Sequence, residues 1–147
     1  MDHVSTVDIH GPSVQLTTHP EVVCNWLTGG SDEVVFAAMR HSFRATVADE
    51  FDACALQGLE SPLVLDEQRS LLAKRSPRLL ATQPIWAGLI ARRHGDSELL
   101  DAMERWWANL LRYSRRDQLS LPNALQTIDA SKFRLVAGSN YESPVHK

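Results

Sequence analysis

The repeat of apolar positions is clearest between Asp96 and Tyr113, where large apolar side chains recur every three or four residues. The side chains that follow this spacing are Leu99, Leu100, Met103, Trp106, Trp107, Leu110 and Leu111. Such a repeat places apolar groups on one side of an α-helix and polar groups on the other. We therefore expect an amphipathic helix over about 96–113 that packs against a core.

Residues that cap helices mark further helix starts. Thr18 and Thr46 each stand three residues before an acidic residue, Glu21 and Asp49, which is the spacing of a capping box. A serine shortly before a proline, at 61–62 and again at 120–122, is also typical of a helix start. We expect helices over about 18–28, 46–57, 61–74 and 120–127.

Runs of apolar residues between these helices predict strands. The continuous run Val34-Val35-Phe36 predicts a buried strand within 33–38. A second strand is expected from Ile85 to Arg92, where Gly88 indicates a bulge or the close approach of another group. Further extended pieces are expected at 13–16 and 132–136. Helices packed against a small sheet predict a mixed, helix-rich α/β fold.

Composition narrows the class of protein. The chain has 147 residues, of which 44% are apolar and 22% charged, as in one soluble globular domain. Its net charge of −3 argues against broad nucleic-acid binding. Neither a signal peptide nor a membrane-spanning run is visible, and Cys24 and Cys54 have no pairing motif. Reduced cysteines in a cytoplasmic protein are the expected reading.

Polar residues of the types that catalyse reactions or bind ligands occur in a series of short motifs from position 41 onward. In sequence these are His41-x-x-Arg44 with a following acidic pair, Glu67-Gln68, Arg92-x-His94, Trp106-Trp107 and the segment Ser-Arg-Arg-Asp-Gln-Leu-Ser at 114–120. Each motif alone is weak, and the order and spacing together carry the information.

This ordered set resembles a glycosyltransferase-like family formerly catalogued as a domain of unknown function. Its bacterial members are described as capsular-polysaccharide synthesis proteins, and its plant members as mucilage- or turgor-related proteins, some labelled ceramidases. The resemblance covers about residues 8–147, and the segment 114–120 is its most specific part. It implies the C-terminal portion of a GT-A-like, nucleotide-diphospho-sugar transferase fold. One domain over 1–147 is expected, truncated at its N-terminus, with a polar tail over 138–147.

The family resemblance implies transfer of a sugar from a nucleotide-sugar donor to a cell-surface or capsular glycan. The diphosphate leaving group of such a donor needs cations or a metal ion to take up its developing charge. Arginine guanidinium groups suit phosphate oxygens, and a carboxylate can take the proton of the acceptor. Arg116, Asp117 and Gln118 are therefore the expected catalytic residues.

The remaining site residues implied by the resemblance are expected to bind substrate or metal. Substrate-binding roles fall on His41, Arg44, Glu67, Gln68, Arg92, His94 and Trp107. A divalent ion, manganese or magnesium, is expected at Asp8 and His146. This hypothesis predicts one cleft that contains His41, Arg44, Arg92, His94, Arg116, Asp117 and His146.

Plainer interpretations stand beside these roles. Basic residues after a helix favourably meet its dipole, and a tryptophan on a periodic helix is usually core. The missing nucleotide-binding strands favour a second function, a non-catalytic binding or regulatory module descended from such an enzyme. A hydrolase is disfavoured because no nucleophile triad or metal set has usable spacing. Apolar surface left by a missing half would predict a homodimer.

Overall fold

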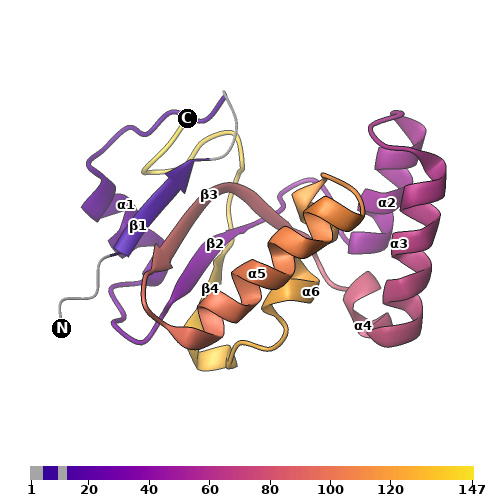
Figure 1. Ribbon diagram of the computed structural model, residues 1–147. Helices are drawn as coiled ribbons and strands as arrows, with labels where there is room; N and C mark the ends of the chain where they lie inside the picture. The colour runs from indigo at the N-terminus through magenta and orange to yellow at the C-terminus, as the bar shows by residue number, and fades with distance from the viewer. Residues whose placement is uncertain (1–4, 10–12) are drawn as a thin grey trace.

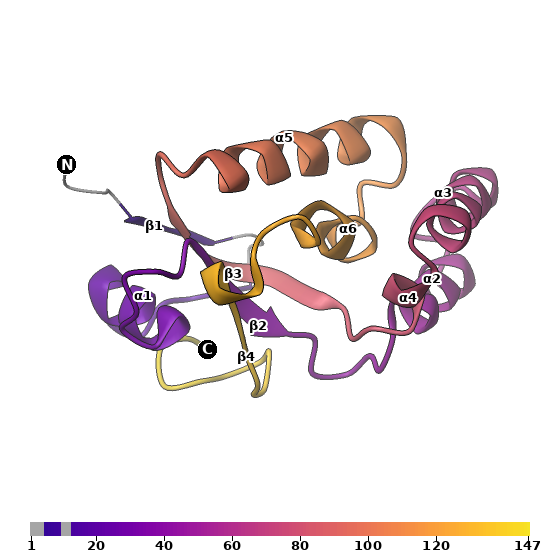
Figure 2. The same ribbon diagram turned by 90° about the horizontal axis from the view of Figure 1, so that it is seen from below.

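Four strands form one mixed sheet that carries helices on both faces (Figures 1 and 2). The computed structural model describes residues 5–9 and 13–147. The strand order is β1–β3–β2–β4, with bounds Ser5–Ile9, Ile85–Arg93, Phe36–Arg40 and Phe133–Val136. β3 runs antiparallel to both neighbours, whereas β4 pairs with β2 in parallel. The expected mixed α/β class is confirmed.

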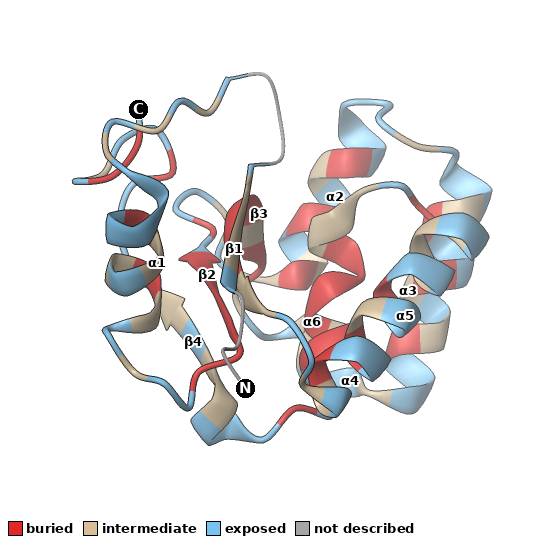
Figure 3. Ribbon diagram, turned by 60° about the vertical axis from the view of Figure 1, so that its left-hand side comes forward, coloured by how far each residue is buried: buried red, intermediate tan, exposed pale blue. Residues whose placement is uncertain are grey.

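The two faces of the sheet are covered by different helices. Figure 2 shows α5 (Ser97–Arg112) and α6 (Leu121–Leu125) above the sheet and α1 (Pro20–Thr28) below it. Successive side chains of a strand point to opposite faces. In β2, accordingly, Phe36 and Ala38 join the core under α5 and α6, and Ala37 and Met39 join the core under α1. Figure 3 shows the buried parts concentrated on the strands and the inner sides of these helices.

Three helices lie beyond one end of the sheet (Figure 1). They are α2 (Val47–Leu56), α3 (Pro62–Arg75) and α4 (Pro77–Leu80). Their own small core includes Phe51, Leu65 and Leu72, and Leu119 joins it from the 3₁₀ turn η1 (Asp117–Leu119). This contact brings the segment after α5 against α2, at the end of the sheet where β2 stops and β3 starts. A second 3₁₀ turn, η2 (Ala130–Lys132), precedes β4.

Local capping chemistry decides where the helices begin. The capping box of α2 is confirmed, because Thr46 Oγ1 accepts the Asp49 N–H and Asp49 Oδ2 accepts the Thr46 N–H, each at 3.0 Å. The start of α1 expected at Thr18 is wrong. His19 is the N-cap, with its Nδ1 accepting the Glu21 N–H at 3.4 Å. Pro20 fixes this start, since proline fits the first helical position.

The long amphipathic helix is confirmed as α5, with Asp96 as its N-cap. Trp106 is buried in the core, whereas Trp107 lies on the outer side of the helix and is 62% exposed. Neighbouring residues on a helix differ by about 100° in direction. The adjacent tryptophans therefore divide, with Trp106 in the core and Trp107 on the outer side, away from the apolar face on which the sequence pattern placed it. No helix of the described residues is long and apolar enough to cross a bilayer.

The interior of β3 contains the irregularity that Gly88 indicated. The pairing register of β2 with β3 shifts between Ala38 and Met39, whose partners are Ile90 and Trp86. The Trp86 ring lies directly over Gly88, so a Cβ added there would overlap it. Of the two alternatives expected at Gly88, the close approach is confirmed, and the register shift beside it is a bulge or a similar irregularity.

Three parts of the chain differ from the sequence-based expectation. β1 was not expected, because only Val7 and Ile9 are apolar in its five residues; it pairs along β3 from Ser5↔Arg93 to Ile9↔Leu89. The segment 138–147 is folded against the body, with Val145 buried. Backbone hydrogen bonds of 2.9 and 3.0 Å join Gln15 to Lys147. The extended piece at 13–16 is reduced to an isolated bridge at Leu16.

Candidate functional site

The loop between β2 and α2, residues 41–46, is held in place by the C-terminal segment. Asn140 Oδ1 accepts the Ser42 N–H at 2.6 Å, and Asn140 Nδ2 donates to the Arg40 carbonyl at 2.8 Å. The Asn140 N–H donates to Ser42 Oγ at 3.1 Å. On the other side, Gln83 Nε2 donates to the His41 carbonyl at 2.7 Å. The His-x-x-Arg motif is therefore presented by a fixed loop.

Two arginines of this region share one buried carboxylate. Glu50 lies in the first turn of α2 on the same inward face as Phe51, and its side chain is only 5% exposed. Arg44 Nε is 3.0 Å from Glu50 Oε2, and Arg116 Nη2 is 3.9 Å from Glu50 Oε1. Because an unpaired buried carboxylate is costly, both guanidinium groups stabilise it. One negative charge between two positive charges leaves an excess of positive charge.

His41 is buried beside the two arginines and is uncharged at neutral pH. Burial first, and then the charges of Arg44 and Arg116, lower the pKa of His41 to about 4. Its ring meets the ring of Phe43 edge-on, with the centroids 4.2 Å apart. A neutral imidazole has one donor and one acceptor nitrogen, so His41 offers a hydrogen bond here and adds no charge.

Buried polar atoms with unfilled hydrogen-bonding capacity gather in this cluster. His41 Nδ1, Arg116 Nε and Gln118 Oε1 have no hydrogen-bond partner among the described residues. The contact of Arg44 with Glu50 is within ion-pair distance but is not aligned as a hydrogen bond. Most buried polar groups in native proteins are paired. The unfilled atoms therefore mark a place where a ligand or ordered water would complete the bonding.

An exposed aromatic pair borders the arginines. Phe43 is 48% exposed and Tyr141 is 75% exposed, and their rings stack with centroids 5.7 Å apart. The Arg44 guanidinium lies 5.4 Å from the Phe43 ring centroid. Exposed aromatic faces of this kind stack on sugar or base rings. Sequence reasoning assigned neither residue, although Phe43 stands inside the His-x-x-Arg motif.

The expected catalytic triplet lies on the turn that closes this cluster. Arg116 precedes η1, and Asp117 Oδ1 accepts the Gln118 N–H at 2.9 Å, so the turn is locally fixed. Leu119, buried against α2, anchors it. The structure thus brings His41, Arg44 and Arg116 together, with Asp117 and Gln118 on the adjoining turn.

Arg92 and His94 do not join this cluster, and the prediction that they share its cleft is wrong. The antiparallel register places Arg40 opposite Ile85 and Phe36 opposite Arg92. His41 therefore lies at one end of β3 and Arg92 at the other. Seven residues of strand separate the two ends by roughly 23 Å.

The far end of β3 uses its polar groups within the sheet. Arg92 Nε donates to Asp8 Oδ2 at 2.6 Å across the β1–β3 pair. His94, just after β3, has its Nε2 2.9 Å from the hydroxyl of Thr6, which lies in β1 like Asp8. Both contacts join β1, at the edge of the sheet, to the end of β3, so these residues have a structural role here.

The residues expected to hold a metal do not fit that role. Asp8 is paired with Arg92. Both ring nitrogens of buried His146 are used, with Nδ1 2.6 Å from Ser143 Oγ and Nε2 3.2 Å from the Asn140 carbonyl. Because the carbonyl can only accept, His146 Nε2 donates and Nδ1 accepts. Within residues 5–9 and 13–147, no group of three or more His, Cys, Asp or Glu side chains could hold a metal ion.

The other expected substrate-binding residues lie outside the loop cluster. Glu67 is exposed and pairs with Arg112 at 2.5 Å. Gln68 is buried in α3, and its Oε1 accepts the Ser114 N–H at 3.3 Å. Trp107 faces outward from α5.

Comparisons with known proteins found no match. No family model, no curated protein and no solved structure matches the chain. The geometry of the cluster and the motif resemblance are therefore the two sources for its function.

Proposed function

We propose that this chain is a glycosyltransferase-like protein that moves a sugar from a nucleotide-sugar donor to a cell-surface or capsular glycan. The observation that carries the proposal is the pair of guanidinium groups, Arg44 and Arg116, on the single buried carboxylate of Glu50. The charge left over favours an anionic group at this place. The resemblance of the motif order supplies the reaction, and a GT-A-like relation of the fold is part of the same proposal.

The outer side of the cluster is open to solvent at its two arginines. The side chains of Arg44 and Arg116 are 26% and 39% exposed, so both reach the surface while Glu50 does not. A diphosphate that meets these two groups would pair with the guanidinium charge that Glu50 alone does not balance. The rings of Phe43 and Tyr141 stand beside Arg44, where they would stack on the base or the sugar of the donor.

The transfer step would take place at the turn that follows Arg116. The hydroxyl oxygen of the acceptor bonds to the anomeric carbon, and the bond from that carbon to the diphosphate oxygen breaks. The proton of the hydroxyl passes to the Asp117 carboxylate, and the diphosphate leaves with the electron pair, next to Arg116. Gln118, whose Oε1 has no hydrogen-bond partner among the described residues, would accept a hydrogen bond from a sugar hydroxyl.

A divalent ion stays a hypothesis of the resemblance alone, because Asp8 and His146 do not fit it. A cytoplasmic location also stays a prediction. So does a homodimer, for which the exposed Leu100, Trp107 and Leu111 along α5 offer an apolar surface. Light scattering tests the dimer, and a monomeric mass would contradict it.

A second candidate function, binding without catalysis, is favoured by one observation. Arg92, His94 and His146, expected in the cleft, are engaged in contacts elsewhere. A module that keeps only the loop cluster would recognise a nucleotide or a glycan and transfer nothing.

Calorimetry with uridine- and guanosine-diphosphate sugars, with and without manganese, tests the proposal. We expect binding of at least one donor, weakened about tenfold or more in Arg44→Gln and in Arg116→Gln, since each removes a charge-assisted contact. Arg115→Gln is the matched control, because Arg115 is the exposed neighbour of Arg116.

Two outcomes separate the candidates. The transferase is supported if the wild type binds a donor and then releases the nucleoside diphosphate, while Asp117→Asn binds the donor but releases no nucleoside diphosphate. Binding without release under every acceptor tried supports the binding module. No heat with any donor contradicts the transferase and leaves only a module that binds a glycan.

A further inference from the structure

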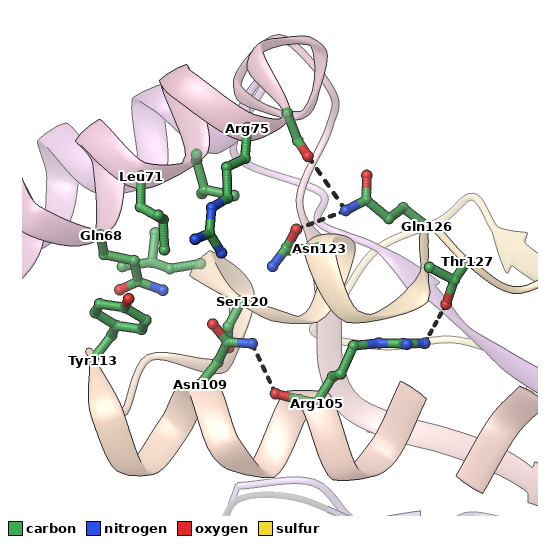
Figure 4. A pocket seen from close by; sticks show the side chains of 13 residues that line it. Gln68, Leu71, Arg75, Arg105, Asn109, Tyr113, Ser120, Asn123, Gln126 and Thr127 are labelled. Carbon is green, nitrogen blue, oxygen red and sulfur yellow. Dashed lines mark hydrogen bonds between the residues drawn. The ribbon is translucent and has the colours of Figure 1, made fainter. Parts of the chain in front are cut away.

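A polar cavity lies between α3, α5 and α6, and its lining contains none of His41, Arg44, Glu50 and Arg116 (Figure 4). Its volume is about 330 Å³. The lining contains two arginines, Arg75 and Arg105, and no aspartate or glutamate. The remaining polar lining consists of amide and hydroxyl side chains. The cavity wall is therefore positively charged.

Hydrogen bonds to neighbouring groups fix which ends of two amides face into the cavity. Gln68 is 2% exposed and must accept the Ser114 N–H through Oε1, so its NH₂ group is left for the cavity. Asn123 Oδ1 accepts Gln126 Nε2 at 2.8 Å, which leaves the NH₂ group of Asn123 facing inward. Figure 4 shows both amide nitrogens turned toward the open space. The two amides thus present donors.

Arg75 adds a charged donor to the same space. It lies at the end of α3, and Figure 4 shows its guanidinium group turned into the cavity toward Asn123 and Ser120. In the part of the chain that the structure describes, no carboxylate is within ion-pair distance of Arg75. Arg105 is held at the rim by a hydrogen bond to Thr127 Oγ1. The charge of Arg75 is thus available to a ligand.

Acceptors for hydroxyl groups stand opposite these donors. Asn109 Nδ2 donates to the Arg105 carbonyl at 2.7 Å, so Asn109 Oδ1 is left as an acceptor. The hydroxyls of Tyr113 and Ser120 complete the lining on this side. The volume is at the lower end of the range for small-molecule sites, about 300–1,000 Å³.

We propose that this cavity binds an oxyanion, a phosphate or a carboxylate, carried by a small polyhydroxylated molecule such as a sugar phosphate or a uronate. Arg75 and the NH₂ groups of Gln68 and Asn123 bind the oxyanion, and Asn109 Oδ1 accepts from a hydroxyl. Three converging donors without a competing carboxylate select an anion over a neutral sugar. The site does not depend on the proposed sugar transfer.

Calorimetric titration with glucose 6-phosphate, glucuronate, inorganic phosphate and glucose tests this site. We expect one-to-one binding of at least one of the anions and no binding of glucose. Arg75→Gln should weaken the binding about tenfold or more, because it removes a charge-assisted contact. Arg78→Gln is the matched control, since Arg78 is exposed on the next helix and does not line the cavity.

Asn123→Asp gives a second test that keeps the shape of the side chain. A carboxylate in place of the inward NH₂ group repels the anion, so binding should disappear while the circular dichroism spectrum stays unchanged. Binding of glucose 6-phosphate but not glucuronate assigns the site to phosphate, and the reverse assigns it to a carboxylate; either supports the proposal. No binding of any anion, or equal affinity in Arg75→Gln and Arg78→Gln, overturns it. Arg44→Gln and Arg116→Gln should leave this binding unchanged, which separates its failure from failure of the donor site.

Discussion

The two ends of β3 differ in how the charges of nearby arginines are balanced. At the end near Arg92, each arginine charge has its own partner, as in the pair of Arg92 with Asp8. At the end near Ile85, two arginines, Arg44 and Arg116, share the single carboxylate of Glu50. A balanced pair stabilises a sheet edge and needs nothing more. An unbalanced, partly buried cluster with unfilled polar atoms is what a binding site for an anion requires.

The largest expected difference between the two ends is in stability. Glu50→Gln leaves two guanidinium groups facing each other without their carboxylate, and should lower the free energy of unfolding by about 2–4 kcal/mol. Asp8→Asn breaks a pair whose two side chains are each more than a quarter exposed, and should cost less than about 1 kcal/mol. Urea denaturation measures both. Equal losses in the two variants would remove the contrast between the ends.

The pH dependence of stability tests the burial of His41. Its folded pKa of about 4 lies below the ordinary value of 6.5, so the unfolded chain binds the proton more readily. The contribution of neutral His41 is complete above pH 6.5 and is lost as the pH falls toward 4. The loss is at most about 3 kcal/mol. We expect the free energy of unfolding, measured by urea denaturation at pH values from 4 to 7, to rise less steeply with pH in His41→Asn than in the wild type. The same dependence on pH in both proteins would contradict the burial of His41.

Asn140→Ala tests whether the C-terminal segment positions the loop. Two side-chain hydrogen bonds, to Ser42 and to the Arg40 carbonyl, are lost, and the free energy of unfolding should fall by about 1–3 kcal/mol. Donor affinity should fall as well, because the His41 and Arg44 groups are no longer held in register. Tyr141→Leu is the control for stability alone: it keeps Asn140 and its hydrogen bonds, removes an exposed ring, and should leave the free energy of unfolding nearly unchanged. A loss of stability without any loss of donor affinity would show that Asn140 has no part in the site.

The smallest expected effect is that of Arg92→Gln on donor binding. Arg92 lies about 23 Å along the strand from the cluster, so the affinity measured by calorimetry should stay within about twofold of the wild type. A large loss would mean that both ends of the sheet act on one ligand. That result would restore the single cleft expected from the motifs.

Local signals in the sequence were enough for most of the fold. The Thr46–Asp49 capping box and the repeat that forms α5 act within a few residues, and both are confirmed. The sequence pattern does not predict β1, because Val7 and Ile9 are its only apolar residues and two are too few to indicate a strand. It is stabilised by pairing with β3, a contact that local patterns do not contain.

Only part of the candidate site could be predicted from the sequence. The motif order brought out His41, Arg44 and Arg116, which do meet. The position of Arg92 depends on an antiparallel register that no local pattern fixes. Glu50 entered the prediction only as part of the acidic pair after Arg44, although its spacing from Val47 and Cys54 places it on the inward face of α2. That spacing was the available signal for its burial.

A crystal structure of the protein with a nucleotide-sugar donor tests the central claim most directly. We predict that the diphosphate lies against the guanidinium groups of Arg44 and Arg116, with a ring of the donor next to Phe43 and Tyr141. Electron density for the diphosphate at Arg92, or a donor that leaves the His41–Arg44 loop untouched, would contradict the account.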